Sequence, residues 1–189
     1  MNILRIDSST NGANSVSRTL TQAIVAHLTA SHEAASVWER DLAAQPIPHL
    51  DPAHAQANRS SEIGGLDEDV LAQFLEADAI VIGAPMYNFA IPSQLKAWID
   101  RLAVPRRTFR YGESGVEGLA GGRKIIIASA RGGTYGDDSP MDFQESYLKA
   151  FFGFIGIDDV AVIRAEGIGL GEEARAKAIA DAKEAIASL

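Results

Sequence analysis

Short apolar runs alternate with longer amphipathic segments along most of this chain. Four runs, NILRID, AIVIGA, KIIIASA and DVAVIRAE, have the length and aliphatic content of strands, and a fifth run is a weaker candidate. The predicted strands are Asn2–Asp7, Ala35–Glu39, Ala79–Ala84, Lys124–Ala130 and Asp159–Glu166. The nearly unbroken apolarity of AIVIG and IIIA is typical of strands that helices cover on both faces.

Helical patterns fill most of the segments between these strands. The predicted helices are Ser17–Thr29, Leu66–Ala77, Ser93–Leu102, Asp142–Ile155 and Glu172–Ser188. Regular alternation of strand and helix indicates right-handed crossovers and a parallel sheet. The expected fold class is therefore α/β, with a three-layer, doubly wound, five-stranded parallel sheet in the flavodoxin-like order 2-1-3-4-5. In that order, the ligand crevice lies at the carboxyl ends of the first and third strands.

Two stretches fit neither pattern. Residues 45–65 contain Pro46, Pro48 and Pro52, and we expect them to run irregularly over the surface. Residues 108–122 contain TFRY and are rich in glycine, and we expect a small hairpin insertion there. The chain as a whole, residues 1–189, is expected to form a single domain, since chains usually divide only beyond about 200–250 residues.

Composition narrows the choice of partners. The chain has 17 Lys and Arg against 25 Asp and Glu, and its net charge of −8 has the wrong sign for binding a nucleic-acid backbone. No apolar run approaches the roughly 18 residues of a membrane span, and the first residues lack a signal-peptide pattern. We therefore expect a cytoplasmic protein that acts on neither membranes nor nucleic acids.

Composition also narrows the chemistry. The sequence has no cysteine, which excludes disulfides, thiolate nucleophiles and cysteine-bound metals, so any redox chemistry requires a cofactor. The 4 histidines share no metal-ligand spacing, and no metal site is expected.

A polar loop, SSTNGANSVS, follows the first predicted strand. The amide groups at the start of the next helix would face this loop, together with the positive end of the helix dipole. One serine is enough to cap a helix, so the excess of serines favours a phosphate site over a cap alone. Neither the P-loop pattern nor the dinucleotide-binding glycine pattern is present, which excludes a Walker site and disfavours a Rossmann dinucleotide site.

Two further loops are expected at the same edge of the sheet. The third strand leads into PMYNF, an aromatic loop between two prolines that is suited to covering a flat ligand, although its rings could instead pack on a neighbouring loop. The fourth strand ends in SARGGTYG, where Gly132 and Gly133 would let backbone N–H groups approach a ring, although a plain turn is the alternative. A ligand with a phosphate at one end and a flat ring at the other would span all three loops.

Three segments together resemble a known family. In order and spacing, APMYNFAIPSQLKAWIDRL, TFRYGESGVEGLAGGRKIIIASARGG and FFGFIGI resemble the FMN-dependent NAD(P)H azoreductases, also described as NAD(P)H:quinone oxidoreductases. The resemblance extends from the first strand to about Glu166. It implies a flavoprotein enzyme in which NADH or NADPH reduces bound FMN, and a quinone or azo compound then takes up two electrons in a ping-pong cycle. It implies no catalytic side chain, because the chemistry takes place on the flavin.

The resemblance also implies the residues of the site. The cofactor-binding residues would be Ser9, Ser15, Val16 and Ser17 at the phosphate, Met86, Tyr87, Asn88 and Phe89 along the ring, and Ala130, Arg131, Gly132 and Gly133 at the pyrimidine edge. The substrate pocket would be lined by Tyr111 and by Phe154 of the partner subunit in a homodimer.

This chain departs from the family at two places. It has Ala130 where the family usually has serine, which leaves only a backbone contact there. It has Thr134 and Tyr135 where many members have a histidine, so a substrate contact from that histidine is not expected. Phe154 also shares a helical stripe with Tyr147 and Ala150, and a second apolar face on this helix favours a dimer interface.

Two other functions remain as alternatives. A flavodoxin-type electron carrier would bind the same cofactor, but NADH or NADPH alone would not reduce it. A phosphate-ester hydrolase could use the serine loop, but the sequence shows neither a cysteine nucleophile nor a Ser-His pairing.

Overall fold

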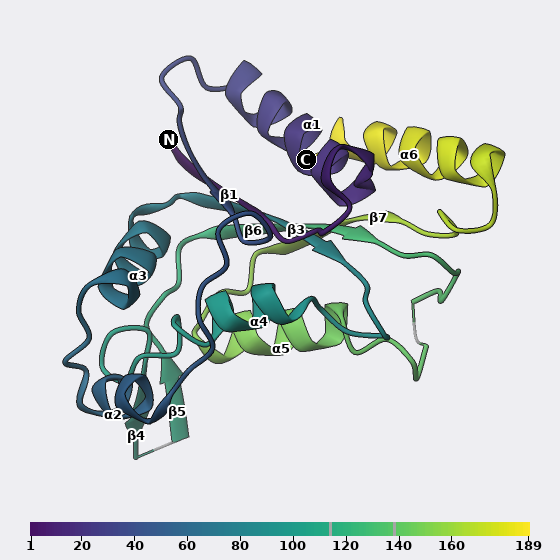
Figure 1. The fold of residues 1–189 in the computed structure, drawn as a ribbon. Helices are drawn as coiled ribbons and strands as arrows, with labels where there is room; N and C mark the ends of the chain where they lie inside the picture. The colour runs from purple at the N-terminus through teal and green to yellow at the C-terminus, as the bar shows by residue number, and fades with distance from the viewer. Residues whose placement is uncertain (114, 138) are drawn as a thin grey trace.

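The computed structural model describes residues 1–113, 115–137 and 139–189. Its main sheet has five parallel strands in the order β2-β1-β3-β6-β7 (Figure 1). The strands are β1 (Asn2–Asp7), β2 (Ser36–Asp41), β3 (Ala79–Pro85), β6 (Lys124–Ala130) and β7 (Val160–Ala165). Numbered within this sheet alone, the order is 2-1-3-4-5, so the predicted topology is confirmed.

Helices cover both faces of the sheet. α1 (Val16–Ala30) and α6 (Glu172–Ile186) lie on one face, and α3 (Leu66–Glu76), α4 (Ser93–Ile99) and α5 (Glu145–Phe154) lie on the other (Figure 1). Every residue of β3 is buried, as expected for a strand with helices on both sides. The core on the α3–α5 face includes Phe74, Trp98 and Phe152, and fully burying such a side chain stabilises the fold by about 1.5–3 kcal/mol.

The prediction of an irregular path for residues 45–65 is wrong in its middle part. Pro52–Ser60 form helix α2, where Asp51 accepts a hydrogen bond from the N–H of His54 and Pro52 opens the helix. None of the 9 residues of α2 is buried, so the helix has no apolar face to reveal it by periodicity. The signal that was present is the aspartate cap followed by proline at the first helical position.

A hairpin lies beside the end of α5. β4 (Phe109–Gly112) and β5 (Gly115–Gly118) pair antiparallel. Gly118 must be glycine, because a Cβ there would lie 2.1 Å from the backbone nitrogen of Gly156. The hairpin is at the opposite end of the molecule from the loops that follow β1, β3 and β6 (Figure 1).

Parallel pairing brings those three loops together. β1 pairs with β3, and β3 pairs with β6 through Pro85 opposite Ala130, so the chain leaves all three strands at one edge. Just beyond, the N–H of Met86 donates to the carbonyl oxygen of Ala130 at 2.8 Å. We call the three loops together the site edge: residues 8–15, 85–92 and 131–136. Among the helices described, none is both long enough and apolar enough to cross a membrane.

Candidate functional site

The serine loop places several hydroxyl groups below the surface. Ser9, Ser15 and Ser17 are all buried, and the oxygens of Ser15 and Ser17 lie 3.1 Å apart. Ser15 caps α1, since its Oγ accepts the N–H of Arg18 at 3.2 Å. Neither Ser9 nor Ser17 occupies the cap position. Buried hydroxyls at the N-terminus of a 15-residue helix are suited to an anion such as phosphate.

Two arginines that the sequence prediction missed hold this loop by its carbonyl groups. Arg18 Nη2 donates to the carbonyl of Ser9 at 2.9 Å, and Arg175 Nη2 donates to the carbonyl of Asn14 at 3.0 Å. Arg18 also binds both carboxylate oxygens of Asp41 at 2.7 Å, and these hydrogen bonds lower the pKa of Asp41. Arg18 stands next to the serine run and could have been noticed, whereas Arg175 comes from the last helix and nothing in the sequence points to it.

The aromatic loop contains an unusual turn. Tyr87 and Ala90 exchange two backbone hydrogen bonds, of 2.9 and 3.1 Å, and both central residues have positive φ, +49° at Asn88 and +72° at Phe89. Asparagine tolerates this conformation, but a left-handed backbone at a bulky residue is strained by about 1–2 kcal/mol. The turn keeps the ring of Phe89 out of the core, and 41% of this residue is exposed.

Tyr87 connects the aromatic loop to the serine loop. Its hydroxyl group lies 3.0 Å from Thr10 Oγ1, accepts the N–H of Thr10 at 3.1 Å and lies 3.5 Å from Ser9 Oγ. Burial acts to raise the pKa of this hydroxyl, but its hydrogen bonds to Ser9 and Thr10 outweigh burial and lower the pKa. The side chain predicted to lie along the ring therefore reaches the serine loop.

The glycine pair presents backbone N–H groups at the crevice. The carbonyl oxygens of Gly132 and Gly133 accept the N–H groups of Gly169 and Gly167, at 3.0 and 2.9 Å. Within residues 1–113, 115–137 and 139–189, the N–H groups of Gly132 and Gly133 donate to no other protein group. These donors are therefore available to an oxygen or nitrogen atom of a ligand.

Gly132 and the serine loop border one hollow of about 380 Å³. Its lining residues are Asn11, Asn14, Val16, Gly132, Ile168, Gly169 and Arg175. The structure thus brings two of the three predicted loops into a shared cavity, and the aromatic loop joins them through Tyr87.

Two other predicted residues are buried, and their side chains are not exposed at the crevice. Ala130 is 4% exposed, and its carbonyl oxygen already accepts the N–H of Met86. Arg131 is fully buried, and its side chain pairs with acidic residues behind the loop. Tyr135, at a position where the family often has histidine, places its ring 6.4 Å from that of Phe89, edge to face.

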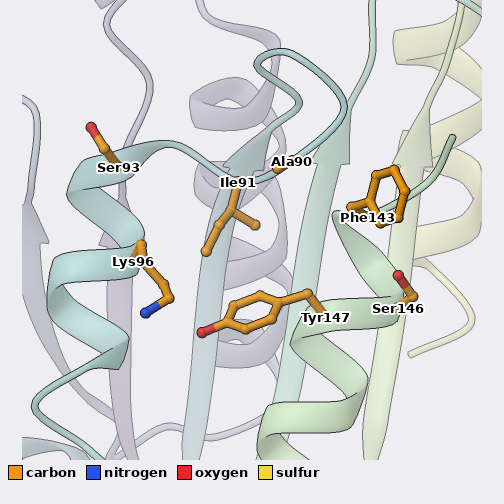
Figure 2. Close-up of a pocket in the computed structure, with 7 residues that line it drawn as sticks. All are labelled: Ala90, Ile91, Ser93, Lys96, Phe143, Ser146 and Tyr147. Carbon is orange, nitrogen blue, oxygen red and sulfur yellow. The ribbon is translucent and has the colours of Figure 1, made fainter.

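A second hollow lies between α4 and α5, next to the aromatic loop. Its volume is about 670 Å³, and Figure 2 shows Lys96 and Tyr147 on facing helices, with Ala90, Ile91, Ser93, Phe143 and Ser146 around them. Burial, with a smaller contribution from the charge of Asp100, raises the pKa of Tyr147 to about 12. This hollow is mainly apolar, and none of the predicted cofactor residues lines it.

The predicted pocket residues Tyr111 and Phe154 lie elsewhere in the chain. Both pack on Phe109, with ring centroids 5.6 and 4.8 Å from it, and Tyr111 is 76% exposed. α5 has 10 residues, so Phe154 stands about 15 Å along the helix from the end that faces the aromatic loop. Within one chain, the structure does not bring Tyr111 and Phe154 to the site edge.

The sheet order and the three converging loops define a flavodoxin-like protein. A family model described as a flavodoxin-like fold matches residues 1–189. The chain is 53% identical to the FMN-dependent NADH:quinone oxidoreductase of Methylocella silvestris, over 100% of this chain and 98% of that protein. It is 54% identical to FMN-dependent NADH:quinone oxidoreductase 1 of Xanthomonas euvesicatoria, over 96% and 93% of the two chains. The chain belongs to this family, as its motifs indicate.

Solved structures support the same assignment. The azoreductase of Bacillus anthracis matches with a TM-score of 0.87 and 26% identity, over 100% of both chains. An FMN-dependent NADH-azoreductase from the same species, in complex with FMN, matches with a TM-score of 0.84 and 27% identity, over 100% of this chain and 99% of that one.

Proposed function

We propose that this protein is an FMN-dependent oxidoreductase that uses NADH or NADPH to reduce quinones and azo compounds. The observation that carries the proposal is the hollow that Gly132 and the serine loop border together, next to a glycine pair whose N–H groups have no protein acceptor among the described residues. The names of its relatives, FMN-dependent NADH:quinone oxidoreductases that are more than 50% identical over nearly the whole chain, favour NADH as the donor.

The residues of the site edge suit each part of FMN. Ser9, Ser15, Val16 and Ser17 would hold the phosphate at the start of α1, where the helix dipole and the backbone N–H groups favour an anion. Met86, Tyr87, Asn88 and Phe89 would line the ring and its approach, with the Tyr87 hydroxyl near the phosphate end. Ala130, Arg131, Gly132 and Gly133 would present backbone groups to the pyrimidine edge.

When bound, FMN supplies the redox chemistry by accepting a hydride from the nicotinamide and passing two electrons to the acceptor. The protein's part is to bind, orient and polarise. The N–H groups of Gly132 and Gly133 would donate to the ring where negative charge develops, and preorganised donors of this kind stabilise such charge strongly. The rings of Phe89 and Tyr135 would border the open face on which a flat substrate stacks.

A homodimer is part of the proposal. An apolar surface runs along α5, where Phe143 is 58% exposed and Phe154 is 37% exposed, with the hollow around Tyr147 between them. A second copy that covers this surface would bring its own Tyr111 and Phe154 to the aromatic loop, which one chain cannot do for itself. Sedimentation of the wild type and of Phe154→Asp tests the proposed homodimer, and a monomeric wild type would contradict it.

The proposal places the enzyme in the cytoplasm.

The decisive experiment is a visible absorption spectrum of the purified protein with added FMN, followed by anaerobic addition of NADH and then of a quinone. Bleaching by NADH and recovery with the quinone are expected. Bound flavin that neither NADH nor NADPH bleaches would favour the electron-carrier alternative, and a protein that binds no flavin would refute the proposed site.

Two variants test the site itself. Asn88→Ala and Gly133→Val should each weaken FMN binding, the first by losing a polar contact and the second by filling the approach to the N–H groups. Gly64→Val is the matched control, because its added Cβ would meet nothing within 4 Å and it lies away from the site edge. Full FMN affinity in both test variants would show that the site is elsewhere.

A further inference from the structure

The segment Asp142–Glu145, where α5 begins, is bonded to the aromatic loop at its turn and to the end of β3 that leads into this loop. The N–H of Phe143 donates to the carbonyl oxygen of Phe89 at 3.1 Å. The side-chain amide of Gln144 donates to the carbonyl oxygen of Ala84 at 2.6 Å. These bonds hold the loop at its start and at its strained turn. We call the segment Asp142–Glu145 the clip.

The same segment holds Arg131, the residue before the glycine pair. Arg131 Nε donates to the side-chain oxygen of Gln144 at 2.9 Å, and Arg131 Nη2 lies 2.6 Å from Asp142 Oδ2 and 2.6 Å from Glu145 Oε1. Gln144 therefore binds the end of β3, which leads into the aromatic loop, with its nitrogen and Arg131 with its oxygen. One side chain thus connects the start of the aromatic loop to the residue before the glycine pair, and both loops are proposed to contact the same ring.

This junction is shielded from water and its geometry is fixed. Arg131 and Gln144 are fully buried, and Glu145 is 2% exposed. A buried guanidinium group binds its acceptors in one plane, so a shift of either loop would break several bonds together. Arg131 Nη1 also binds Glu166 Oε1 at 3.0 Å, which ties the junction to the chain beyond β7.

Asp142 binds both the backbone of the clip and the side chain of Arg131. One carboxylate oxygen accepts the N–H groups of Gln144 and Glu145, at 2.9 and 3.1 Å, and the other oxygen pairs with Arg131. Burial acts to raise the pKa of Asp142, but the hydrogen bonds from Glu145 and Arg131 outweigh it and lower the pKa. The carboxylate is thereby kept charged where Arg131 requires it.

We propose that Arg131 and the clip are positioning residues for the cofactor: they set the distance between the aromatic loop and the N–H groups of Gly132 and Gly133. None of their side chains needs to touch the ring, because they act through the loops. The identity of the ring rests on the proposed function, whereas the mechanical coupling of the two loops does not.

A matched control separates positioning from stability alone. Thr108 is also neutral, fully buried and a bridge between backbone segments, since its hydroxyl donates to the carbonyl of Leu102 at 2.6 Å and accepts the N–H of Val104 at 3.0 Å. It lies away from the site edge. Gln144→Leu and Thr108→Val both remove buried hydrogen bonds, but only Gln144→Leu uncouples the loops.

The first measurement is amide hydrogen exchange in the FMN-free protein. In Gln144→Leu, the hydrogen-bonded amides of Met86, Tyr87, Ala90 and Arg131 should exchange at least about tenfold faster relative to the amides of β1. In Thr108→Val, the ratio of these rates should stay within about twofold of the wild type. Unchanged exchange at both loops in Gln144→Leu would overturn the inference, whether or not FMN binds.

The second measurement is FMN affinity by fluorescence quenching, together with the visible circular dichroism of the bound flavin. Gln144→Leu should raise Kd about tenfold and change the dichroism spectrum, while Thr108→Val does neither. Arg131→Lys should be more stable than Arg131→Met. It should bind FMN about as poorly as Arg131→Met does, because an ammonium group cannot reproduce the planar fork of the guanidinium group. Faster exchange with unchanged Kd and dichroism would also overturn the inference.

The two proposals can fail separately. If the wild type binds no FMN, the proposed function fails, and the exchange experiment alone then decides whether the clip couples the loops. If the wild type binds FMN and is bleached by NADH while Gln144→Leu behaves like Thr108→Val, the function stands and the positioning role is refuted.

Discussion

The site edge and the region around α2, α3 and the end of α4 contain the same three local features and use them differently. Each region has a fully buried arginine, Arg131 at the site edge and Arg101 after α4. Each has a capped helix start, at Ser15 and at Asp51. Each also has a non-glycine residue with positive φ, Phe89 and Ser61. We refer to the second region as the α2–α4 region.

The two arginines show the difference most clearly. Arg101 binds one carboxylate oxygen of Asp67, at 2.9 Å, and the carbonyl of Ala97 on its own helix, so it joins α3 to α4 within the core. Arg131 binds Ser129 of β6, the segment Asp142–Glu145 at the start of α5, and Glu166 beyond β7. A buried charge of the same type therefore stabilises packing in one region and arranges loops in the other.

The residues with positive φ differ in the same way. Ser61 has φ +62° at the end of α2, where a left-handed residue is a common way to stop a helix. Phe89 ends no helix; its positive φ belongs to the two-residue turn between Tyr87 and Ala90, a turn type that needs positive φ at both central residues. A bulky residue is strained at such a position, and strain of this kind is common at functional sites.

The largest expected effect comes from removing either buried arginine. Arg101→Met and Arg131→Met should each lower the free energy of unfolding by about 3–5 kcal/mol, because each leaves buried carboxylate charge uncompensated. Urea unfolding measures this loss, and FMN titration of the folded fraction measures affinity. Only Arg131→Met should weaken FMN binding.

A double variant sharpens this contrast. Arg101→Met with Asp67→Leu should recover most of the lost stability, because an apolar pair of similar volume can replace a buried ion pair. If Arg101→Met instead weakens FMN binding as much as Arg131→Met does, the distinction between the two regions is wrong.

The sequence could predict the elements that bury an apolar face and the loops that carry the site motifs. Apolar runs and their spacing were enough for the sheet order and for the helices that cover it, because each of those helices buries a face. The motifs PMYNF and RGG pointed to the loops at the site edge, because the switch-point rule fixes where such loops meet. α2 escaped prediction because it buries none of its residues.

The contacts behind the loops could not be predicted in this way. Gln144, Glu166 and Arg175 lie far from the site motifs in sequence, and a polar residue in a helical or loop segment shows no period that would reveal its partner. The positive φ values at Asn88 and Phe89 had a partial signal in asparagine alone. Long-range polar contacts depend on tertiary structure, so only the folded structure shows them.

The next effect in size is at the strained turn. Phe89→Gly and Phe89→Ala both remove the ring, but glycine adopts φ +72° without strain, so the glycine variant should be more stable by about 1 kcal/mol. Both variants should bind FMN more weakly than the wild type. Ser61→Gly should leave stability nearly unchanged, because relief of strain is offset by loss of the bond from Ser61 Oγ to the carbonyl of Pro105, which is 2.6 Å long. Equal stability of the two Phe89 variants, measured in urea, would show that the turn is not strained.

Smaller effects are expected from the two helix caps. Ser15→Ala and Asp51→Ala should each lower the free energy of unfolding by about 0.5–1 kcal/mol, since each leaves one N–H at a helix start without its side-chain acceptor. Only Ser15→Ala should also weaken FMN binding, because Ser15 is proposed to serve the phosphate. An equal loss of FMN affinity in Asp51→Ala would assign the effect to general stability.

The smallest expected effect is a pH dependence of opposite sign in the two regions. Burial raises the pKa of Asp7, which directly precedes the site edge at the end of β1, above its ordinary 3.8, against hydrogen bonding from Thr21 and the charges of Arg5 and Arg18. The stability that protonated Asp7 contributes is therefore complete below pH 3.8 and is lost as pH rises through the raised folded-state pKa.

In the α2–α4 region, the hydrogen bonds from Arg107 lower the pKa of Glu68 below its ordinary 4.5. The stability that ionised Glu68 contributes is therefore present above pH 4.5 and is lost as pH falls through the lowered folded-state pKa. Urea unfolding of the FMN-free wild type, Asp7→Asn and Glu68→Gln between about pH 3 and 7 measures both differences. As pH rises, the free energy of unfolding of the wild type should fall relative to that of Asp7→Asn. As pH falls, it should fall relative to that of Glu68→Gln. If both differences change in the same direction with pH, the contrast between the two carboxylates is wrong.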